Sequence, residues 1–181
     1  MTRKVWAIAL TSATIAAYGL GLFYEGLLAR QSSDTMTFPF VDRVSAGRAY
    51  DNIAENAPVS QRAMIVDRLL KANPASGQSW ALLSYVDWLR NGKHLSPAGV
   101  AALDRSYGLD PYDHDLGPWR VNFALENWDA LSRNQRGIAI SEASWILQYD
   151  WRASPDLKAR LKTIRNPAGQ AMAKLELVLA P

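Results

Sequence analysis

Cysteine is absent from the 181 residues of this chain. Disulfides, thiol nucleophiles, c-type haem attachment and cysteine-ligated zinc or iron–sulfur sites are therefore excluded. Histidine is also scarce, with His94 and His114 alone, and the chain has no nucleophile elbow, phosphate-cradling Gly-rich loop or candidate His-centred triad. We therefore predict a protein that is not an enzyme and that carries no cofactor.

Charged side chains are missing from residues 5–24, directly after Arg3 and Lys4. As an α-helix, such a run is about 30 Å long, which matches the hydrocarbon core of a bilayer. It is longer than the apolar core of a signal peptide, and no convincing small-x-small cleavage site follows it. We predict an uncleaved transmembrane helix over 5–29. The basic start, residues 1–4, favours a cytoplasmic N-terminus, so the rest of the chain would lie in the periplasm of a Gram-negative cell.

Small residues recur every four positions along this predicted membrane helix. They share one helix face and are Ala9, Ala13, Ala17 and Gly21. Such a stripe lets another helix approach closely, although Ala and Gly are frequent in any membrane helix. The stripe is therefore a candidate helix-packing face for a membrane partner or for self-association.

The positive charge of the chain is concentrated near its C-terminus. Residues 31–150 carry a balance of −3, whereas residues 151–181 carry +4. The candidate contacts for an anionic partner are Arg152, Lys158, Arg160, Lys162 and Arg165. A solvated helix face explains them as well as an anionic lipid or an acidic polysaccharide does. Nothing in the pattern predicts a nucleic-acid partner.

Alternating runs of β-branched residues are also absent, so strands are not expected. After a polar linker at 30–41, prolines and capping residues divide residues 42–181 into short segments with apolar spacing typical of helices. The predicted helices are 42–55, 59–72, 76–90, 97–107, 118–131, 135–149, 155–164 and 168–179. This pattern predicts an all-α domain built from antiparallel hairpins.

Two Asx-Pro pairs, Asn73-Pro74 and Asp110-Pro111, lie 37 residues apart. The segment between them, NPASGQSWALLSYVDWLRNGKHLSPAGVAALDRSYGLDP, resembles a tetratricopeptide repeat, whose period is about 34 residues. The matching positions are an early Trp and Leu, a small-residue region and a closing proline: Trp80, Leu83, Ala98, Ala101, Ala102 and Pro111. Ser84 replaces the usual Gly, and about three extra residues precede the proline. The resemblance implies a stack of helical hairpins whose concave face binds peptides or protein segments.

Tryptophan is abundant, and Trp88 and Trp151 lie beside charged residues. Packing of large residues between short helices accounts for most of the tryptophans. Aromatic residues at a binding surface are the alternative, and these two are our candidates for partner contacts.

Acidic residues offer two further hypotheses. Asp110, Asp113, His114 and Asp115 lie within six residues and could hold a cation, but their spacing matches no common metal motif and a turn between helices explains the same residues, so we predict no metal site. A glycan-modifying enzyme would need converging carboxylates, and Glu126, Asp129 and Glu142 are the candidates. Ion pairing with nearby arginines is the other interpretation of Glu126 and Asp129.

These patterns favour a membrane-anchored periplasmic adaptor that binds protein partners in an envelope assembly, with polysaccharide synthesis or export as the first system to consider. Two alternatives stay open. One is a small accessory subunit held in a membrane complex through its transmembrane helix. The other is a carboxylate-dependent periplasmic enzyme that modifies glycans.

Overall fold

The computed structural model describes residues 57–178, and this part of the chain is helical without a strand. The elements are α3 (Val59–Ala72), α4 (Gly77–Arg90), α5 (Pro97–Leu109), α6 (Gly117–Glu126), the 3₁₀ turn η1 (Trp128–Ala130), α7 (Arg133–Tyr149), α8 (Ser154–Leu161), α9 (Pro167–Met172) and the π-helical η2 (Ala173–Val178). The predicted all-α class is confirmed for these residues.

The predicted N-terminal elements lie outside the described residues. They are the basic start at 1–4, the membrane helix at 5–29, the linker at 30–41 and the helix at 42–55. Between residues 57 and 178, no helix is both long and apolar enough to cross a membrane.

Helix starts follow the capping rules. Four N-cap side chains accept a hydrogen bond from the backbone N–H three residues later: Ser76, Ser96, Ser132 and Asn166. Proline occupies the first turn of α5, α6, α8 and α9, where its missing N–H has no helical partner to lose. Local sequence alone therefore places most helix starts.

Two predicted helices end earlier than expected, and one cap differs. The segment predicted at 118–131 breaks after Glu126, where Asn127 Nδ2 donates to the Phe123 carbonyl, and a 3₁₀ turn follows. The segment predicted at 155–164 ends at Leu161. Ser154, the residue before the predicted helix start at 155, is already helical, and Asp150 Oδ1 accepts from the Ala153 N–H that precedes the helix.

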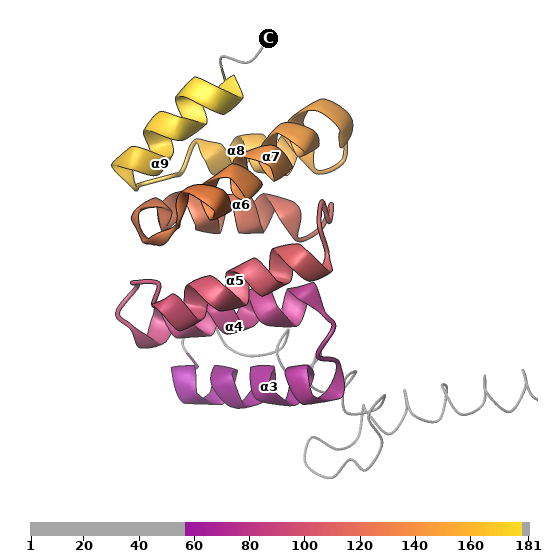
Figure 1. Cartoon of the computed structure of the whole chain (residues 1–181), viewed down its shortest axis with the longest axis vertical. Coiled ribbons are helices and arrows are strands. Elements are labelled where there is room, and N and C mark those ends of the chain that lie inside the picture. Colours follow the sequence, from indigo (N-terminus) through magenta and orange to yellow (C-terminus); the bar gives the residue numbers. More distant parts are fainter. Residues whose placement is uncertain (1–56, 179–181) are drawn as a thin grey trace, which may run out of the picture.

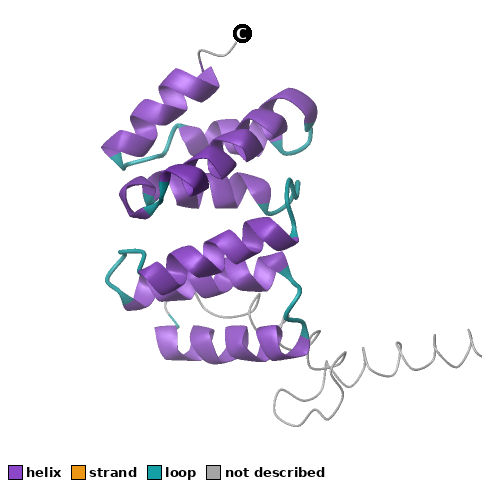
Figure 2. Ribbon diagram, viewed as in Figure 1, coloured by secondary structure: helices purple, strands orange, loops and turns teal. Residues whose placement is uncertain are grey.

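The helices form two groups along the long axis of the described chain (Figure 1). α3 packs on α4, and α4 packs closely on α5. α6 packs on α7 and α8, while α9 crosses α6 and η2 contacts α7. Short loops join the successive helices (Figure 2).

Two apolar clusters lie in the described chain, one within the α6–α9 group and one at the junction of the two groups. Within the α6–α9 group, the buried residues Val121, Leu125, Ile146, Leu157 and Ile164 lie in one cluster. A second cluster joins the two groups through Leu103 and Tyr107 of α5, Phe123 of α6 and Ala139 of α7. Large side chains, several of them aromatic, therefore fill the space between α4–α5 and α6–α7.

Close backbone approach fixes α9 against α6. A Cβ at Gly169 would lie 2.0 Å from the Leu125 carbonyl oxygen, so only glycine fits there. Glu126 strengthens the same contact, because its two carboxylate oxygens accept the backbone N–H groups of Arg165 (2.9 Å) and Asn166 (3.2 Å). The N-terminus of α9 is thus held by the end of α6.

Candidate functional site

A hollow of about 630 Å³ opens between α7, α8 and the α9–η2 segment. Leu147, Leu161 and the buried Ala173 give it an apolar wall. Gln170 and three exposed basic side chains border it: Lys158, Lys162 and Lys174. We call this feature the lysine-rimmed hollow.

The spacing of α8 explains why its lysines share this border. Lys158 and Lys162 are four residues apart, so they lie on one helix face, with Leu161 beside them. Leu157, four residues before Leu161, is fully buried against α6 and α7. Within residues 57–178, none of the three lysines forms an ion pair, so their charge is available to a ligand.

The five predicted anionic contacts have different surroundings. Only Lys158 and Lys162 border the hollow. Arg160 pairs with Asp156 at 2.9 Å, and the Arg152 guanidinium lies over the Trp151 ring, 5.2 Å from its centroid. Arg165 is exposed in the loop before α9. Lys174, which the sequence did not single out, joins the hollow because η2 packs on α7.

The two predicted partner-binding tryptophans have different surroundings. Trp151 follows α7 and is 77% exposed, close in sequence to Tyr149, which is 70% exposed. Trp88 is partly buried: it stacks on Tyr85 with 5.6 Å between ring centroids and meets Phe123 edge-on at 6.0 Å. Trp151 is thus mostly exposed, with Arg152 over its ring, whereas Trp88 mainly packs against other aromatic rings.

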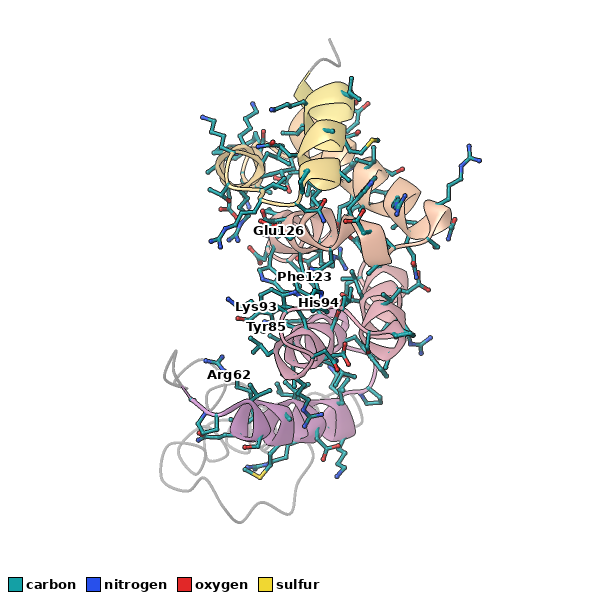
Figure 3. The ribbon with its side chains drawn as sticks, turned by 90° about the vertical axis from the view of Figure 1, so that its left-hand side faces the viewer. Arg62, Tyr85, Lys93, His94, Phe123 and Glu126 are labelled. Carbon is teal, nitrogen blue, oxygen red and sulfur yellow. The ribbon has the colours of Figure 1, made fainter. Side chains whose placement is uncertain are left out.

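The aromatic cluster around Trp88 brings α4 and α6 together. Trp119 stacks on Phe123 at 4.9 Å, and Tyr85 contacts both rings edge-on. Figure 3 shows Tyr85, Phe123 and Lys93 on the same side of the molecule. Lys93 Nζ lies 5.9 Å from the Trp88 centroid, so this aromatic surface also has a cation beside it.

A buried ion pair lies at the junction of the two helix groups. Arg120 of α6 is fully buried and binds Glu142 Oε1 through Nη2. The same guanidinium donates to the Ser106 carbonyl at 3.0 Å and the Asp110 carbonyl at 2.8 Å, and it stacks over Tyr107, 4.6 Å from the ring centroid. Arg120 therefore links α5, α6 and α7 through one side chain.

Burial dominates the electrostatics of this junction. It raises the pKa of Glu142 above the usual 4.5; Arg120 and the nearby Tyr112 amide offset part of that effect, and the Asp113 carboxylate adds to it. Burial, with the Glu142 charge adding to it, raises the pKa of Tyr107 well above 10.0, so its hydroxyl stays protonated at neutral pH.

The acidic turn 110–115 mostly uses its carboxylates to cap backbone groups. Asp110 Oδ2 accepts the Gly77 N–H at 2.7 Å, and Asp113 Oδ1 accepts the N–H groups of Asp115 and Leu116. His114 lies 3.2 Å from an Asp115 oxygen. No three metal-ligating side chains come together anywhere in residues 57–178.

The three carboxylates considered for a glycan-modifying enzyme each make a different contact within the domain. Glu126 holds the start of α9, and Asp129 accepts a hydrogen bond from Asn166 Nδ2 at 3.0 Å. These contacts, and not ion pairs with arginines, account for both residues. Glu142 is bound to Arg120.

Known proteins give no further guide: no family model, no curated protein and no solved structure matches the chain.

Proposed function

We propose that this chain is a membrane-anchored adaptor in a bacterial envelope assembly. The proposed anchor is the uncharged run at 5–29, with the N-terminus in the cytoplasm and the domain at 42–181 in the periplasm. The domain binds a segment of a partner protein. The pairing of α4 with α5 and of α6 with α7 supports kinship with tetratricopeptide repeats, which bind such segments.

The observation that carries the binding function is the lysine-rimmed hollow. An apolar wall bordered by unpaired cations suits an amphipathic segment that carries both apolar and acidic side chains. Burial of the apolar side chains supplies affinity, at roughly 25 cal/mol per Å² removed from water. The lysines steer the acidic residues and set their register. We therefore infer that the partner offers an acidic amphipathic helix.

The position of the hollow fits this role. The three helical segments that line it, α7, α8 and α9–η2, lie at the end of the described chain opposite α3 (Figure 1). Leu175 (62% exposed) and Trp151 (77% exposed) belong to the same C-terminal group and are further apolar side chains open to a partner. Polysaccharide synthesis or export is the first system in which to look for that partner.

Site-specific photo-crosslinking in living cells tests the proposal. Gln170 lines the hollow, and Gln78 of α4 is another exposed glutamine, outside it. A photoreactive residue at position 170 should give a discrete adduct with one protein, and position 78 should not. Lys158→Glu with Lys162→Glu should abolish the adduct, whereas Lys93→Glu, on the aromatic surface, should keep it. Equal adducts from both positions, or an adduct insensitive to charge reversal, would contradict the proposal.

A further inference from the structure

One side of α7 lies away from its buried residues Ala139, Ala143 and Ile146. The residues on that side recur every three or four positions and include Asn134, Ile138, Ser141, Trp145, Gln148 and Tyr149. The helix has 17 residues, so this outer face is about 25 Å long. We propose that the outer face of α7 binds a strand of an acidic polysaccharide built from carboxylated sugars such as uronates. The inference does not rest on the adaptor function, and the face shares no lining residue with the lysine-rimmed hollow.

The exposed charges of residues 131–152 are both positive. α7 begins at Arg133, Arg152 follows its end, and both side chains are exposed. Neither guanidinium forms an ion pair with a carboxylate of residues 57–178. The two carboxylates of the same segment, Glu142 and Asp150, are buried and bonded inside the domain. A strand with regularly spaced carboxylates therefore meets a free cation at each end of the face.

Aromatic rings lie between the two arginines. The Tyr112 ring packs against Trp145 with 5.3 Å between centroids, and Tyr112 is 45% exposed. Tyr149, four residues after Trp145, is 70% exposed. A tyrosine or tryptophan side chain combines an apolar ring with a polar tip. Such rings suit sugar units, which have an apolar C–H face and hydroxyl groups at the edge.

A cavity of about 410 Å³ forms one end of the outer face, between α5 and α7. The α7 residues that line its open side are Arg133, Asn134, Gly137, Ile138 and Ser141. Pro111 and Tyr112 are the lining residues from the acidic turn 110–115, and the aspartates of that turn are not part of the lining. The cavity thus offers a guanidinium, an amide and a hydroxyl beside an aromatic ring. Arginine binds a carboxylate through two parallel hydrogen bonds, so one carboxylated sugar unit can use all four groups.

The polar side chains of the face favour a glycan over a lipid surface. Asn134, Ser141 and Gln148 are exposed along it. Insertion of this face into the apolar part of a bilayer would leave their amide and hydroxyl groups without partners, which is costly. Sugar hydroxyl groups both donate and accept, so they can pair with all three side chains.

Two substitutions block the proposed site, and each has a matched control on α5. Gly137 lines the cavity, and a Cβ added there meets no atom within 4 Å, so Gly137→Leu fills the cavity without disturbing the core. Gly108 is equally open but does not line the cavity. Arg133→Gln removes one exposed cation from the face, and Arg105→Gln removes an exposed cation outside the cavity lining.

The test is ligand-observed saturation-transfer NMR on the full chain in phosphatidylcholine nanodiscs. The probes are tetramers of galacturonate, mannuronate and glucuronate, with methyl-esterified tetragalacturonate as the uncharged match. At least one uronate tetramer should bind, and loss of its charges should weaken binding about tenfold or more. Gly137→Leu should abolish binding, and Arg133→Gln should weaken it about fivefold to tenfold, the usual effect of one charge-assisted hydrogen bond at an exposed site. Gly108→Leu and Arg105→Gln should leave it unchanged.

Four results would overturn the assignment. They are no binding by any uronate tetramer, equal binding of the methyl ester, uronate binding that survives Gly137→Leu, and stronger binding of tetraglutamate or of soluble dihexanoyl phosphatidylglycerol than of every uronate. Thermal unfolding of each variant establishes that a lost signal reflects the site and not the fold.

A final pair of substitutions separates this site from the hollow. Lys158→Glu with Lys162→Glu should leave uronate binding intact, and loss of binding in that variant would assign the sugar to the hollow instead. Crosslinking from position 170 reports on the hollow and not on the outer face of α7. Each proposal can therefore fail while the other holds.

Discussion

Replacing Arg120 by methionine should destabilise the domain more than any surface change. Methionine keeps much of the side-chain volume but removes the partner of Glu142 and the donor to the Ser106 and Asp110 carbonyls. Leaving a buried charge unpaired costs about 3–5 kcal/mol. For a domain of this size that corresponds to a fall in Tm of roughly 10–20 °C.

A double substitution separates the ion pair from mere packing. Arg120→Met combined with Glu142→Met removes both charges, so no unpaired carboxylate stays buried. Exchange of a buried ion pair for apolar residues is often neutral, so the double variant should recover most of the loss. Urea unfolding followed by tryptophan fluorescence measures the unfolding free energies of the natural chain, Arg120→Met, Glu142→Met and the double variant. A single variant that loses under about 1 kcal/mol, or a double variant no more stable than Arg120→Met, would refute the reasoning.

The pH dependence of the same variants gives an independent check. Burial raises the pKa of Glu142 in the folded state, so its contribution to stability is full below pH 4.5 and is lost as the pH rises through the folded-state pKa. Arg120 offsets part of that loss in the natural chain, and methionine cannot. The difference in unfolding free energy between the natural chain and Arg120→Met should therefore widen as the pH rises from 4.5. A difference independent of pH would contradict the assignment of charge to this pair.

Three further predictions concern packing and the anchor. Gly169→Ala should lower the unfolding free energy by about 2 kcal/mol or more in urea titrations, because the new Cβ would press on the Leu125 carbonyl; an unchanged midpoint would mean that α9 can move away. Trp88→Ala should lower the unfolding free energy by about 3 kcal/mol, because aromatic packing is lost. Trp151 is exposed to solvent, so Trp151→Ala should change the unfolding free energy by less than about 0.5 kcal/mol. Thermal unfolding scans of the two variants distinguish these outcomes. If residues 5–29 are an uncleaved membrane helix, the chain should resist carbonate extraction, and mass spectrometry should recover its N-terminal peptide; a shortened, extractable form would contradict this.

Helices were predictable because their signals are local. Ser96-Pro97 marks a helix start through capping and a tolerated proline, and α5 begins at Pro97 as the sequence predicts, whereas α9 begins at Pro167, one residue before the predicted start at 168. The end of α6 was not predictable, because the apolar spacing continues through Trp128 while Asn127 turns the chain.

The junction and the hollow depend on contacts between distant segments. Arg120 lies on the apolar face of its helix, beside Val121 and Ala124, and that position was a readable signal of a buried arginine. Its partner Glu142, 22 residues away, could not be chosen from spacing alone. Lys174 likewise reaches the hollow only because η2 packs on α7.

Charge exchange across the hollow tests the adaptor account most directly. Once crosslinking from position 170 has identified the bound segment, its acidic residues can be changed to lysine in cells that carry Lys158→Glu and Lys162→Glu. The account predicts that either set of changes alone abolishes the adduct and that the two together restore it. Failure of the combined reversal to restore the adduct, with both proteins folded and present, would contradict recognition through the lysine-rimmed hollow.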